Sequence, residues 1–405
     1  MKICYITMQF PVPSETFLSS DVEALVKLGH HISVFGLRPK HSKFKFLIEE
    51  RGHTNIDVEN FSFMTLIFAL KFCILHPIMS LTLIHWVLNV CLKSPIMLLK
   101  SFILMPSVFG HFYKVYNSKP DVVHLFWGHY PSMLGFLVKR FMPYSVVSQF
   151  LGAHDLVSNY PGSTALAYDA DLIFTHSKSN VPILEKRGID IDKIHVIYRG
   201  IKLDFPHIVN TNKFHSTDNL LFLTASRLIK EKGVDDVLRV FSKVTDSFPN
   251  AKLYIAGDGP YKSDLLKLSV NLGCSERVFF LGHIPQSELV KYMSDSHFFI
   301  LMSRSLSERL PNVVKEAMYQ QCVVITTRSV GIDELVDSGV SGYVVSNLDY
   351  LACTEHVMFC LLYPDVARSI CVSARNVIKQ HFDVDQSMRK YIVLWTASIN
   401  DKGLL

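Results

Sequence analysis

The chain has 405 residues, of which 49% are hydrophobic, and this is enough apolar material for more than one buried core. The composition excludes an intrinsically disordered protein, and two domains are the natural expectation for this length. Eight scattered cysteines without a CxxC pair argue against a zinc site or a disulfide framework and favour a reducing compartment. The N-terminal run KICYIT is strand-like and shows no secretory signal.

The formal charge of +5 is concentrated between residues 60 and 120, which contain five lysines and no aspartate or glutamate. Within this segment, residues 72–92 form an uncharged run of 21 residues, interrupted by Pro77, two histidines and Asn89. Three interpretations stay open: helices on an anionic membrane face, buried core helices, and a membrane span. We favour the first, because apolar side chains combined with lysines suit such a surface. The lysines are Lys71, Lys93, Lys100, Lys114 and Lys119.

Short apolar runs alternate with amphipathic segments along almost the whole chain. This pattern is typical of βαβ units and of parallel sheets covered by helices on both faces. The polar stretch 202–219 predicts a linker between two such series. The expected strands lie at 2–7, 31–37, 121–128, 144–152, 171–177 and 194–200 in the first series, and at 219–226, 251–259, 277–282, 297–303, 322–327 and 342–345 in the second.

Charged residues stand at the ends of several expected strands in the second series. Arg227 and Lys232 follow its first strand, where two cations can clamp a diphosphate and offset charge on a departing nucleoside diphosphate. Glu308 and Glu316 lie around the start of a helix, whose free N–H groups attract anions while carboxylates accept hydrogen bonds from hydroxyls. Taken singly, these residues have ordinary structural alternatives: solvated loop cations, and acids that complement a helix dipole.

The ordered set SRLIKEKG, YIAGDGP, VFFLGHIP, SERLPNVVKEAM and SGYVV resembles the GT-B glycosyltransferases of the large retaining family with the Glu-x7-Glu element, the glycosyltransferase group 1 type. The resemblance covers nearly the whole chain, and FPVPSETFLSSDVEAL is similar to exopolysaccharide and lipopolysaccharide members. It implies an α/β GT-B fold, in which two doubly wound Rossmann-like domains face each other across a cleft. The acceptor-binding domain is expected over 1–205, joined by a C-terminal helix at 388–405, and the nucleotide-sugar donor-binding domain over 206–387.

The resemblance implies roles for individual donor-site residues. Arg227 and Lys232 correspond to the cations on the donor diphosphate. Glu308 corresponds to the acid on the transferred sugar, and Glu316 to the acid on the ribose. Gly257 and Gly259 either allow close approach of the backbone to the donor or simply form a turn. The peptide N–H groups around residues 310–312 can contact the sugar or the phosphate. These further expected donor contacts are Gly257, Gly259, Leu310, Pro311 and Asn312.

In the first half, the resemblance places His154 near the reacting carbon of the sugar, and we expect it to act with Arg227, Lys232 and Glu308 in catalysis. A lone histidine after a strand is otherwise more often structural. The expected acceptor contacts are Ser14, Glu15, Thr16 and Asp155. Ser14 and Glu15 have an equally strong alternative, in which they only cap the following helix.

Some residues depart from the family pattern. Arg309 and Gln321 stand where glycine is usual, Val323 where proline is common, and Arg199 where asparagine is frequent. Arg309 matters most, because a bulky side chain beside Glu308 changes the room for the donor. These departures put the sugar in doubt and leave room for loss of activity.

Asp169 and Asp171 superficially match the DxD metal site of the other glycosyltransferase fold, GT-A. They precede an expected strand, however, and better fit a helix-to-strand turn. No metal and no cofactor are expected.

The resemblance implies a retaining hexosyltransferase that uses a nucleoside-diphosphate sugar and a saccharide acceptor, expected to be lipid-linked. Its place would be cell-surface polysaccharide biosynthesis (exopolysaccharide, capsule or O-antigen) in the cytoplasm, peripherally on the inner face of the cell membrane, without a nucleic-acid partner. Two alternatives stay open: a non-catalytic GT-B protein that binds nucleotide sugar or glycan, and a nucleotide-sugar epimerase on the same fold. The nucleotide base, the sugar, the acceptor and the oligomeric state do not follow from the sequence.

Overall fold

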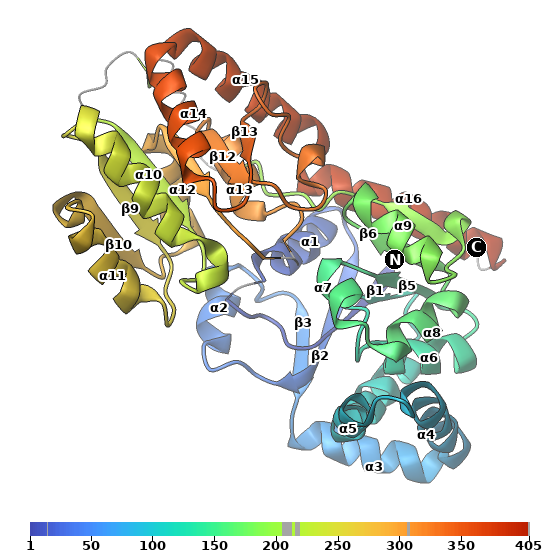
Figure 1. Cartoon of the computed structure of the whole chain (residues 1–405). Helices are drawn as coiled ribbons and strands as arrows, with labels where there is room; N and C mark the ends of the chain where they lie inside the picture. The colour runs from blue at the N-terminus through green and yellow to red at the C-terminus, as the bar shows by residue number, and fades with distance from the viewer. Residues whose placement is uncertain (14, 205–212, 215–218, 306–307, 404–405) are drawn as a thin grey trace. The chain divides into compact units, whose positions relative to one another are not determined.

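The computed structural model describes residues 1–403 except 14, 205–212, 215–218 and 306–307. The chain forms two compact units, shown in Figure 1: unit 1 comprises Met1–Arg199 and Val384–Leu405, and unit 2 comprises Gly200–Asp383. The chain passes from unit 1 to unit 2 after Arg199 and returns to unit 1 after Asp383, a few residues before the expected limits at 205 and 387. Most of the expected linker at 202–219 lies outside the described residues.

Unit 1 is built on a seven-stranded parallel sheet in the order β3-β2-β1-β4-β5-β6-β7. The edge strand β3 was not expected from the sequence, because its segment DVENF is polar and only Asn60 in it is buried. The strands are β1 Lys2–Thr7, β2 His31–Pro39, β3 Asp57–Phe61, β4 Val122–Leu125, β5 Val146–Phe150, β6 Leu172–Thr175 and β7 Ile194–Val196.

Helices cover both faces of this sheet. One face packs against α3–α6 and α8, with Phe72, Val87 and Phe112 in the core, and the other packs against α1 and α16. The helices are α1 Thr16–Lys27, α2 Phe44–Glu50, α3 Phe63–Leu75, α4 Pro77–Cys91, α5 Pro95–Ser118, α6 Ser132–Phe141, α7 Ala153–Ser158, α8 Pro161–Asp169, α9 Val181–Lys186 and α16 Val384–Asp401, with short 3₁₀ turns η1 Lys178–Asn180 and η2 Ile191–Lys193.

The C-terminal helix α16 is part of the unit 1 core. Trp395 is fully buried, and its indole Nε1 donates to Ser148 Oγ on β5 at 2.9 Å. The same hydroxyl lies 2.9 Å from Nδ1 of the buried His124 on β4, and burial lowers the pKa of His124 to about 3. The neutral imidazole and the hydroxyl therefore satisfy each other inside the core.

Unit 2 is built on a six-stranded parallel sheet in the order β10-β9-β8-β11-β12-β13. Its strands are β8 Leu221–Ala225, β9 Lys252–Ala256, β10 Val278–Gly282, β11 Phe298–Leu301, β12 Val323–Thr327 and β13 Tyr343–Val345. Its helices are α10 Val234–Ser247, α11 Lys262–Asn271, α12 Gln286–Asp295, α13 Asn312–Tyr319, α14 Tyr350–Leu362 and α15 Pro364–His381, with turns η3 Lys230–Lys232, η4 Ser275–Arg277 and η5 Ile332–Glu334.

Each sheet has one point where the path of the chain reverses. In unit 1 the chain moves outward from β1 to β3 and returns to place β4 beside β1; in unit 2 it moves from β8 to β10 and returns to place β11 beside β8. The loops at the carboxyl ends of such neighbouring strands diverge to opposite faces, so ligands of parallel sheets bind there. The fold therefore predicts one site in each unit.

Helix α13 ends in a Schellman motif that places a non-glycine residue in the left-handed region. The N–H of Cys322 donates to Ala317 O at 3.0 Å, and the N–H of Gln321 donates to Met318 O at 3.1 Å. Gln321 has φ of 59°, a conformation that glycine adopts without cost. The position where the sequence departs from a usual glycine thus carries backbone strain.

We expect Gln321→Gly to stabilise the chain by about 1 kcal/mol, because it removes the Cβ from the left-handed position. The midpoint of thermal unfolding should rise by about 2–4 °C for a unit of this size. Gln321→Ala is the matched control: it keeps the Cβ and should give no rise. A glycine variant no more stable than the alanine variant would refute the strain.

Candidate functional site

The centre of the unit 2 site is an ion pair between two residues expected to bind the donor. Lys232 Nζ lies 2.5 Å from Glu308 Oε2, and each side chain is only 16% exposed. Ser303 Oγ donates to the same carboxylate oxygen at 2.6 Å. Lys232 follows β8 and Glu308 follows β11, so the pair stands at the point where the sheet reverses.

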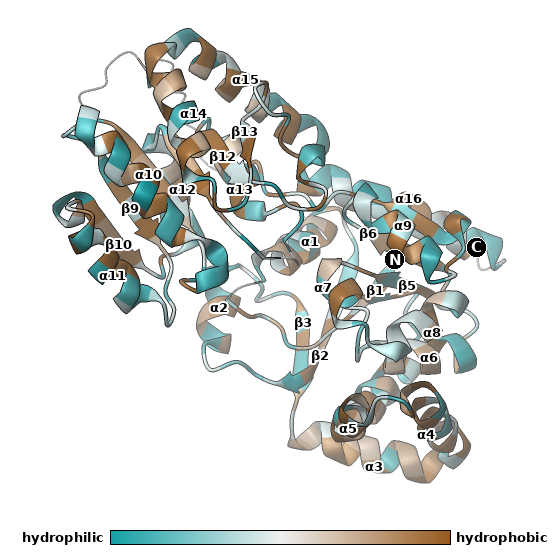
Figure 2. Cartoon of the chain, viewed as in Figure 1, coloured by the Kyte–Doolittle hydropathy of each residue, from teal (hydrophilic) through white to brown (hydrophobic). Residues whose placement is uncertain are grey.

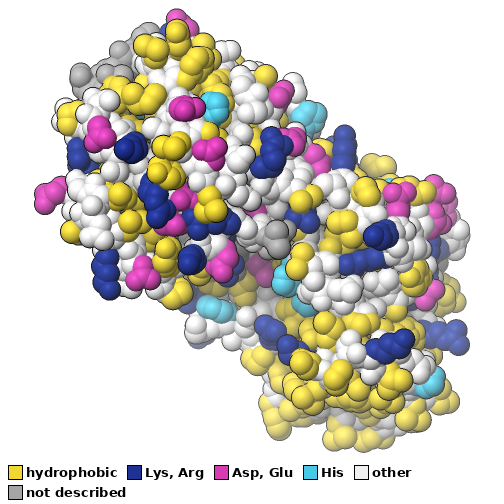
Figure 3. Space-filling view, viewed as in Figure 1, with side chains coloured by type: hydrophobic (Ala, Val, Ile, Leu, Met, Phe, Trp, Pro, Cys, Tyr) yellow, Lys and Arg dark blue, Asp and Glu magenta, His cyan; other side chains and the backbone are white. Residues whose placement is uncertain are grey.

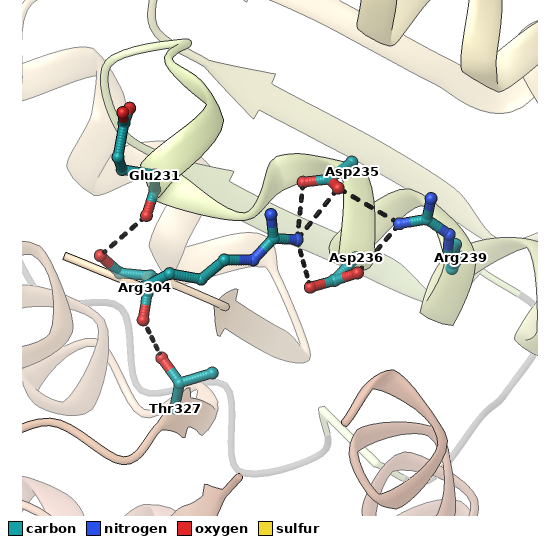
Figure 4. Close-up of polar contacts among 7 residues, drawn as sticks. Glu231, Asp235, Asp236, Arg239, Arg304 and Thr327 are labelled. Atoms are coloured by element: carbon teal, nitrogen blue, oxygen red, sulfur yellow. Dashed lines mark hydrogen bonds and ion pairs between the residues drawn. The ribbon is translucent and has the colours of Figure 1, made fainter. Parts of the chain in front are cut away.

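The loop after β11 is fastened to the start of α10 by Arg304, as Figure 4 shows. Its Nη2 donates to both carboxylate oxygens of Asp235, at 3.0 and 2.9 Å, and to Asp236 at 2.5 Å. Its backbone N–H donates to Glu231 O at 2.7 Å. Acids in the first turn also complement the helix dipole. The network holds the backbone on both sides of the Lys232–Glu308 pair.

The turn that carries Lys232 depends on Gly233, and the loop after β9 depends on two further glycines. Gly233 has φ of 64°, and a Cβ there would lie 1.9 Å from the carbonyl oxygen of Met302. A Cβ on Gly257 would lie 1.8 Å from Ser226 O, and one on Gly259 2.4 Å from Leu228 O. Gly257 and Gly259, expected as donor contacts, therefore let their loop pack against the loop that carries Arg227.

The side chain of Arg227 is exposed, and no hydrogen bond or ion pair to it is found among the described residues. It follows β8 by two positions, on the same loop as Lys232. Because its neighbour Leu228 is held by Asp258 and Tyr261 through backbone hydrogen bonds of 2.9 Å, the backbone of this loop is fixed while the guanidinium is available.

Glu316 lies inside unit 2, one turn into α13. Gln286, the first residue of α12, donates from Nε2 to Glu316 Oε1 at 2.8 Å. Burial raises the pKa of Glu316 to about 7, although Gln286 and Lys315 oppose the shift. The carboxyl group is thus poised between its neutral and charged forms near neutral pH.

The start of α13 places the other expected donor contacts. Leu310 and Pro311 are buried, and Asn312 begins the helix with its side chain accepting a hydrogen bond from Lys315 Nζ at 3.0 Å. Arg309 is buried too; its Nη1 donates to Glu308 O at 3.2 Å. The guanidinium that replaces a usual glycine is therefore folded back onto its own loop.

In unit 1, Asp155 organises the loops after β4 and β5. Its carboxylate accepts from Gly128 N at 3.0 Å, from Gly152 N at 3.1 Å, and lies 3.1 Å from His129 Nδ1. The side chain is fully buried, which favours a positioning role over the expected contact with an acceptor hydroxyl. His154, by contrast, is exposed, with its ring centroid 6.0 Å from that of His129.

The loop after β1 brings Glu15 to the same region. Trp127 Nε1 donates to Glu15 Oε2 at a long 3.5 Å, and Glu15 forms no side-chain cap on α1, so this part of the capping alternative is not what the structure contains. Burial raises the pKa of Glu15, opposed by Trp127 and Arg199. Thr16 is the first residue of α1, and Ser14 lies outside the described residues.

Arg199, which stands where asparagine is frequent, lies over an aromatic cluster beside this region. Its guanidinium carbon is 4.3, 4.8 and 4.3 Å from the ring centroids of Phe17, Phe126 and Phe150. Such contacts stabilise the cation and hold α1 against the sheet.

Asp169 and Asp171 connect α8 to β6, as the helix-to-strand interpretation expected. Asp171 lies 2.5 Å from Lys139 Nζ and 2.9 Å from Lys402 Nζ, and it accepts from Val147 N. Within the described part of the chain, no three His, Cys, Asp or Glu side chains are grouped as a metal site requires.

Several residues of these two regions were not anticipated from the sequence: Ser303, Arg304, Gln286 and His129. Arg304, Gln286 and His129 act through partners 26 to 69 positions away, whereas Ser303 lies five positions from Glu308; no local motif identifies them. Only His129 could have been proposed from the sequence, because it follows an expected strand, as His154 does.

In unit 2, the structure brings Lys232 and Glu308 into contact and places Arg227 on the loop of Lys232, while Glu316 contacts Gln286. Arg227 and Lys232 suit a diphosphate, Glu308 suits hydroxyl groups, and Glu316 suits a second set of hydroxyls once ionised.

Comparisons with known proteins fit this chemistry. Residues 209–375 match the family "Glycosyl transferases group 1". The amylovoran biosynthesis glycosyltransferase AmsK of Erwinia amylovora is 23% identical over 380 residues, covering 86% of this chain and 88% of AmsK. The uncharacterized glycosyltransferase MJ1059 of Methanocaldococcus jannaschii is 30% identical over 165 residues, but that match covers 39% of this chain and only 40% of MJ1059.

The fold has solved counterparts over its full length. The crystal structure of Anabaena Alr3699/HepE in complex with UDP superposes with a TM-score of 0.72 at 18% identity, covering 98% of this chain and all of that one. The chain is an α/β protein with two Rossmann-like parallel sheets, the GT-B fold of its solved counterparts, and residues 209–375 are similar to the group 1 glycosyltransferases.

Proposed function

We propose that the chain is a retaining glycosyltransferase that moves a hexose from a nucleoside-diphosphate sugar to a saccharide acceptor. The observation that carries the proposal is the Lys232–Glu308 pair at the reversal point of the unit 2 sheet, with Arg227 on the same loop. The acceptor is proposed to be lipid-linked and the product a cell-surface polysaccharide. AmsK, named for amylovoran biosynthesis, and HepE, solved with UDP and with UDP-glucose, support this choice of substrates.

Donor binding would exchange the partners of the ion pair. The diphosphate would form ion pairs with Lys232 and Arg227. Glu308 would accept hydrogen bonds from sugar hydroxyls and would retain the hydrogen bond from Ser303. Glu316 accepts from the ribose. Because every charged group gains a new partner, none is left buried and unpaired.

In the transfer step, the acceptor oxygen bonds to the anomeric carbon on the face from which the diphosphate leaves. The carbon–oxygen bond to the phosphate breaks, its electron pair stays on the phosphate oxygen, and the acceptor proton passes to that oxygen. Lys232 and Arg227 stabilise the charge that develops there, so no metal is required. His154 is proposed to orient the reacting groups through hydrogen bonds.

The function is tested by incubating the purified chain with a panel of UDP- and GDP-sugars, with and without polyprenyl-diphosphate-linked saccharides. Acceptor-dependent release of nucleoside diphosphate, with the anomeric configuration retained in the product, is the expected result. An isomerised donor would favour an epimerase, and donor binding without turnover a non-catalytic protein. Either outcome would refute the proposal.

We expect Lys232→Ala to lower kcat by about a hundredfold or more, because it removes a cation from the leaving diphosphate. Lys232→Arg should retain part of the activity, since the charge persists. Lys230→Ala is the matched control: Lys230 lies two residues away on the same 3₁₀ turn and is exposed. It should transfer at the wild-type rate. Equal rates for Lys232→Ala and Lys230→Ala would exclude the assigned site.

The raised pKa of Glu316 predicts pH-dependent donor binding. Since the ribose hydroxyls donate to a carboxylate, the carboxyl group, with a pKa of about 7, must be ionised. The affinity for UDP-glucose, whose diphosphate diester does not titrate in this range, should therefore rise about tenfold from pH 6 to pH 8. Calorimetric titration measures it. Glu316→Gln should bind more weakly at pH 8 and show a flat profile.

Thermal unfolding of the same variant supplies the control. The folded chain retains the Glu316 proton up to about pH 7, whereas the unfolded chain releases it near the ordinary value of 4.5. The free energy of unfolding of the wild type should therefore decrease as the pH rises from about 4.5 to about 7. Glu316→Gln, which has no such proton, should gain stability relative to wild type between pH 5 and pH 8. A constant difference would contradict the raised pKa.

A further inference from the structure

Helices α3, α4 and α5 expose an unusual concentration of large apolar side chains. Of the 34 large hydrophobic side chains that are exposed among the described residues, 15 lie between positions 63 and 103, about a tenth of the chain. We call this surface the α3–α5 apolar face and define it by six members that are 68% to 76% exposed: Phe63, Ile74, Ile78, Leu92, Ile96 and Ile103.

The pictures show the same concentration. In Figure 2 the three helices are predominantly hydrophobic along their length, and in Figure 3 yellow side chains gather over the part of unit 1 that they form. Soluble monomers rarely leave so much contiguous apolar surface in water, so this face is expected to have a partner.

Every charged side chain in the segment that carries the face, residues 60–120, is a lysine. No aspartate or glutamate occurs between positions 60 and 120, and Lys71, Lys93 and Lys100 are exposed within the helical element. Lys114, in contrast, pairs with Glu59. Lysine stems can lie along an apolar boundary while their ammonium groups reach anionic headgroups. The charge is thus complementary to an anionic lipid surface.

The side-chain chemistry favours lipid over protein. Interfaces between proteins are enriched in aromatic residues, methionine and arginine and are depleted of lysine. The defining residues of the α3–α5 apolar face are five aliphatic side chains and one phenylalanine, and the charged residues between positions 60 and 120 are all lysines.

By length and composition α5 could cross a bilayer, and so could α3 and α4 together as a bent pair, but the packing of α5 in unit 1 opposes a span. The second half of α5 belongs to the unit 1 core: Val108, Phe112 and Val115 are fully buried, and His111 Nε2 lies 3.0 Å from Gly36 O. Helices α3 and α4 are bent by 104° at their junction. Only the outer sides of these helices are available to lipid, which corresponds to insertion parallel to the membrane plane.

We propose that the α3–α5 apolar face docks unit 1 onto an anionic membrane, with the helices lying in the headgroup region and Lys71, Lys93 and Lys100 on the phosphates. In a cell this surface is the cytoplasmic face of the membrane, whose lipids are anionic. The inference goes beyond glycosyl transfer and stands without it. If both hold, the acceptor is a saccharide held at the membrane by its own lipid.

The test uses the full chain and flotation with vesicles of phosphatidylcholine alone or mixed with phosphatidylglycerol, at low and high salt. Wild type should float with the mixed vesicles, and high salt should weaken but not abolish binding. Ile74→Ser combined with Ile78→Ser should reduce the vesicle-bound fraction at least about tenfold. Leu266→Ser combined with Val270→Ser, at exposed positions of α11 in unit 2, is the matched control and should bind as wild type.

Two further variants separate the contributions. Replacing Lys71, Lys93 and Lys100 with glutamine should remove the preference for phosphatidylglycerol. Ile96→Trp should give indole fluorescence that shifts to the blue and is quenched by brominated lipid, which reports insertion. Thermal unfolding and UDP-glucose binding should be unchanged in all variants, so that a failure here is separate from a failure of the proposed transferase activity.

Two results would overturn the proposal. One is wild-type protein that stays monomeric and floats with neither type of vesicle. The other is a dimer in sedimentation that Ile74→Ser with Ile78→Ser dissociates, without any vesicle binding by wild type, because the face would then join two copies of the chain.

Discussion

The loops after β8 and β11 leave adjacent strands at the reversal point of the unit 2 sheet, and the pair of Lys232 with Glu308 ties them together. Both groups are largely withdrawn from water, so removing either partner would leave a poorly solvated charge. A ligand that separates them must therefore offer an anion to one and hydroxyl donors to the other. An activated sugar carries both in a single molecule. Under the proposed function, the resting pair would discriminate against a phosphate alone or a sugar alone, because either one satisfies only half of it.

All twelve strands expected from the spacing of apolar runs are present in the structure. They could be predicted because parallel strands buried on both faces are nearly continuous hydrophobic segments. The strand β3 was missed, since an edge strand needs few buried side chains and its sequence is polar. For the helices between residues 60 and 120, composition alone could not predict the environment of the side chains. The same apolar composition fits a core, a membrane span and a surface, and α5 in fact combines a buried half with an exposed one. Only the packing of Val108 and Phe112 against the sheet distinguishes the halves.

The ordered set of motifs predicted that Lys232 and Glu308 belong to one candidate site, and the structure brings these two side chains into contact. The sequence did not predict the chemistry where the environment sets it. The raised pKa of Glu316 depends on burial and on Gln286, thirty positions away. Asp155 was expected at an acceptor, yet its backbone partners Gly128 and Gly152 use the carboxylate within the domain. Gly128 and Gln286 lie 27 and 30 positions from the carboxylates they contact and leave no local signature, so these contacts become visible only in three dimensions.

The return of α16 to the first sheet has a consequence for how the chain is made. Unit 2 is one continuous stretch, whereas one sheet face of unit 1 is not fully covered until residues 384–401 have been synthesised. Until Trp395 reaches Ser148, the nascent protein carries an open hydrophobic surface beside a finished neighbour. A chain that stops before residue 384 would contain all of unit 2 but an incompletely covered unit 1, which chaperones and proteases would recognise.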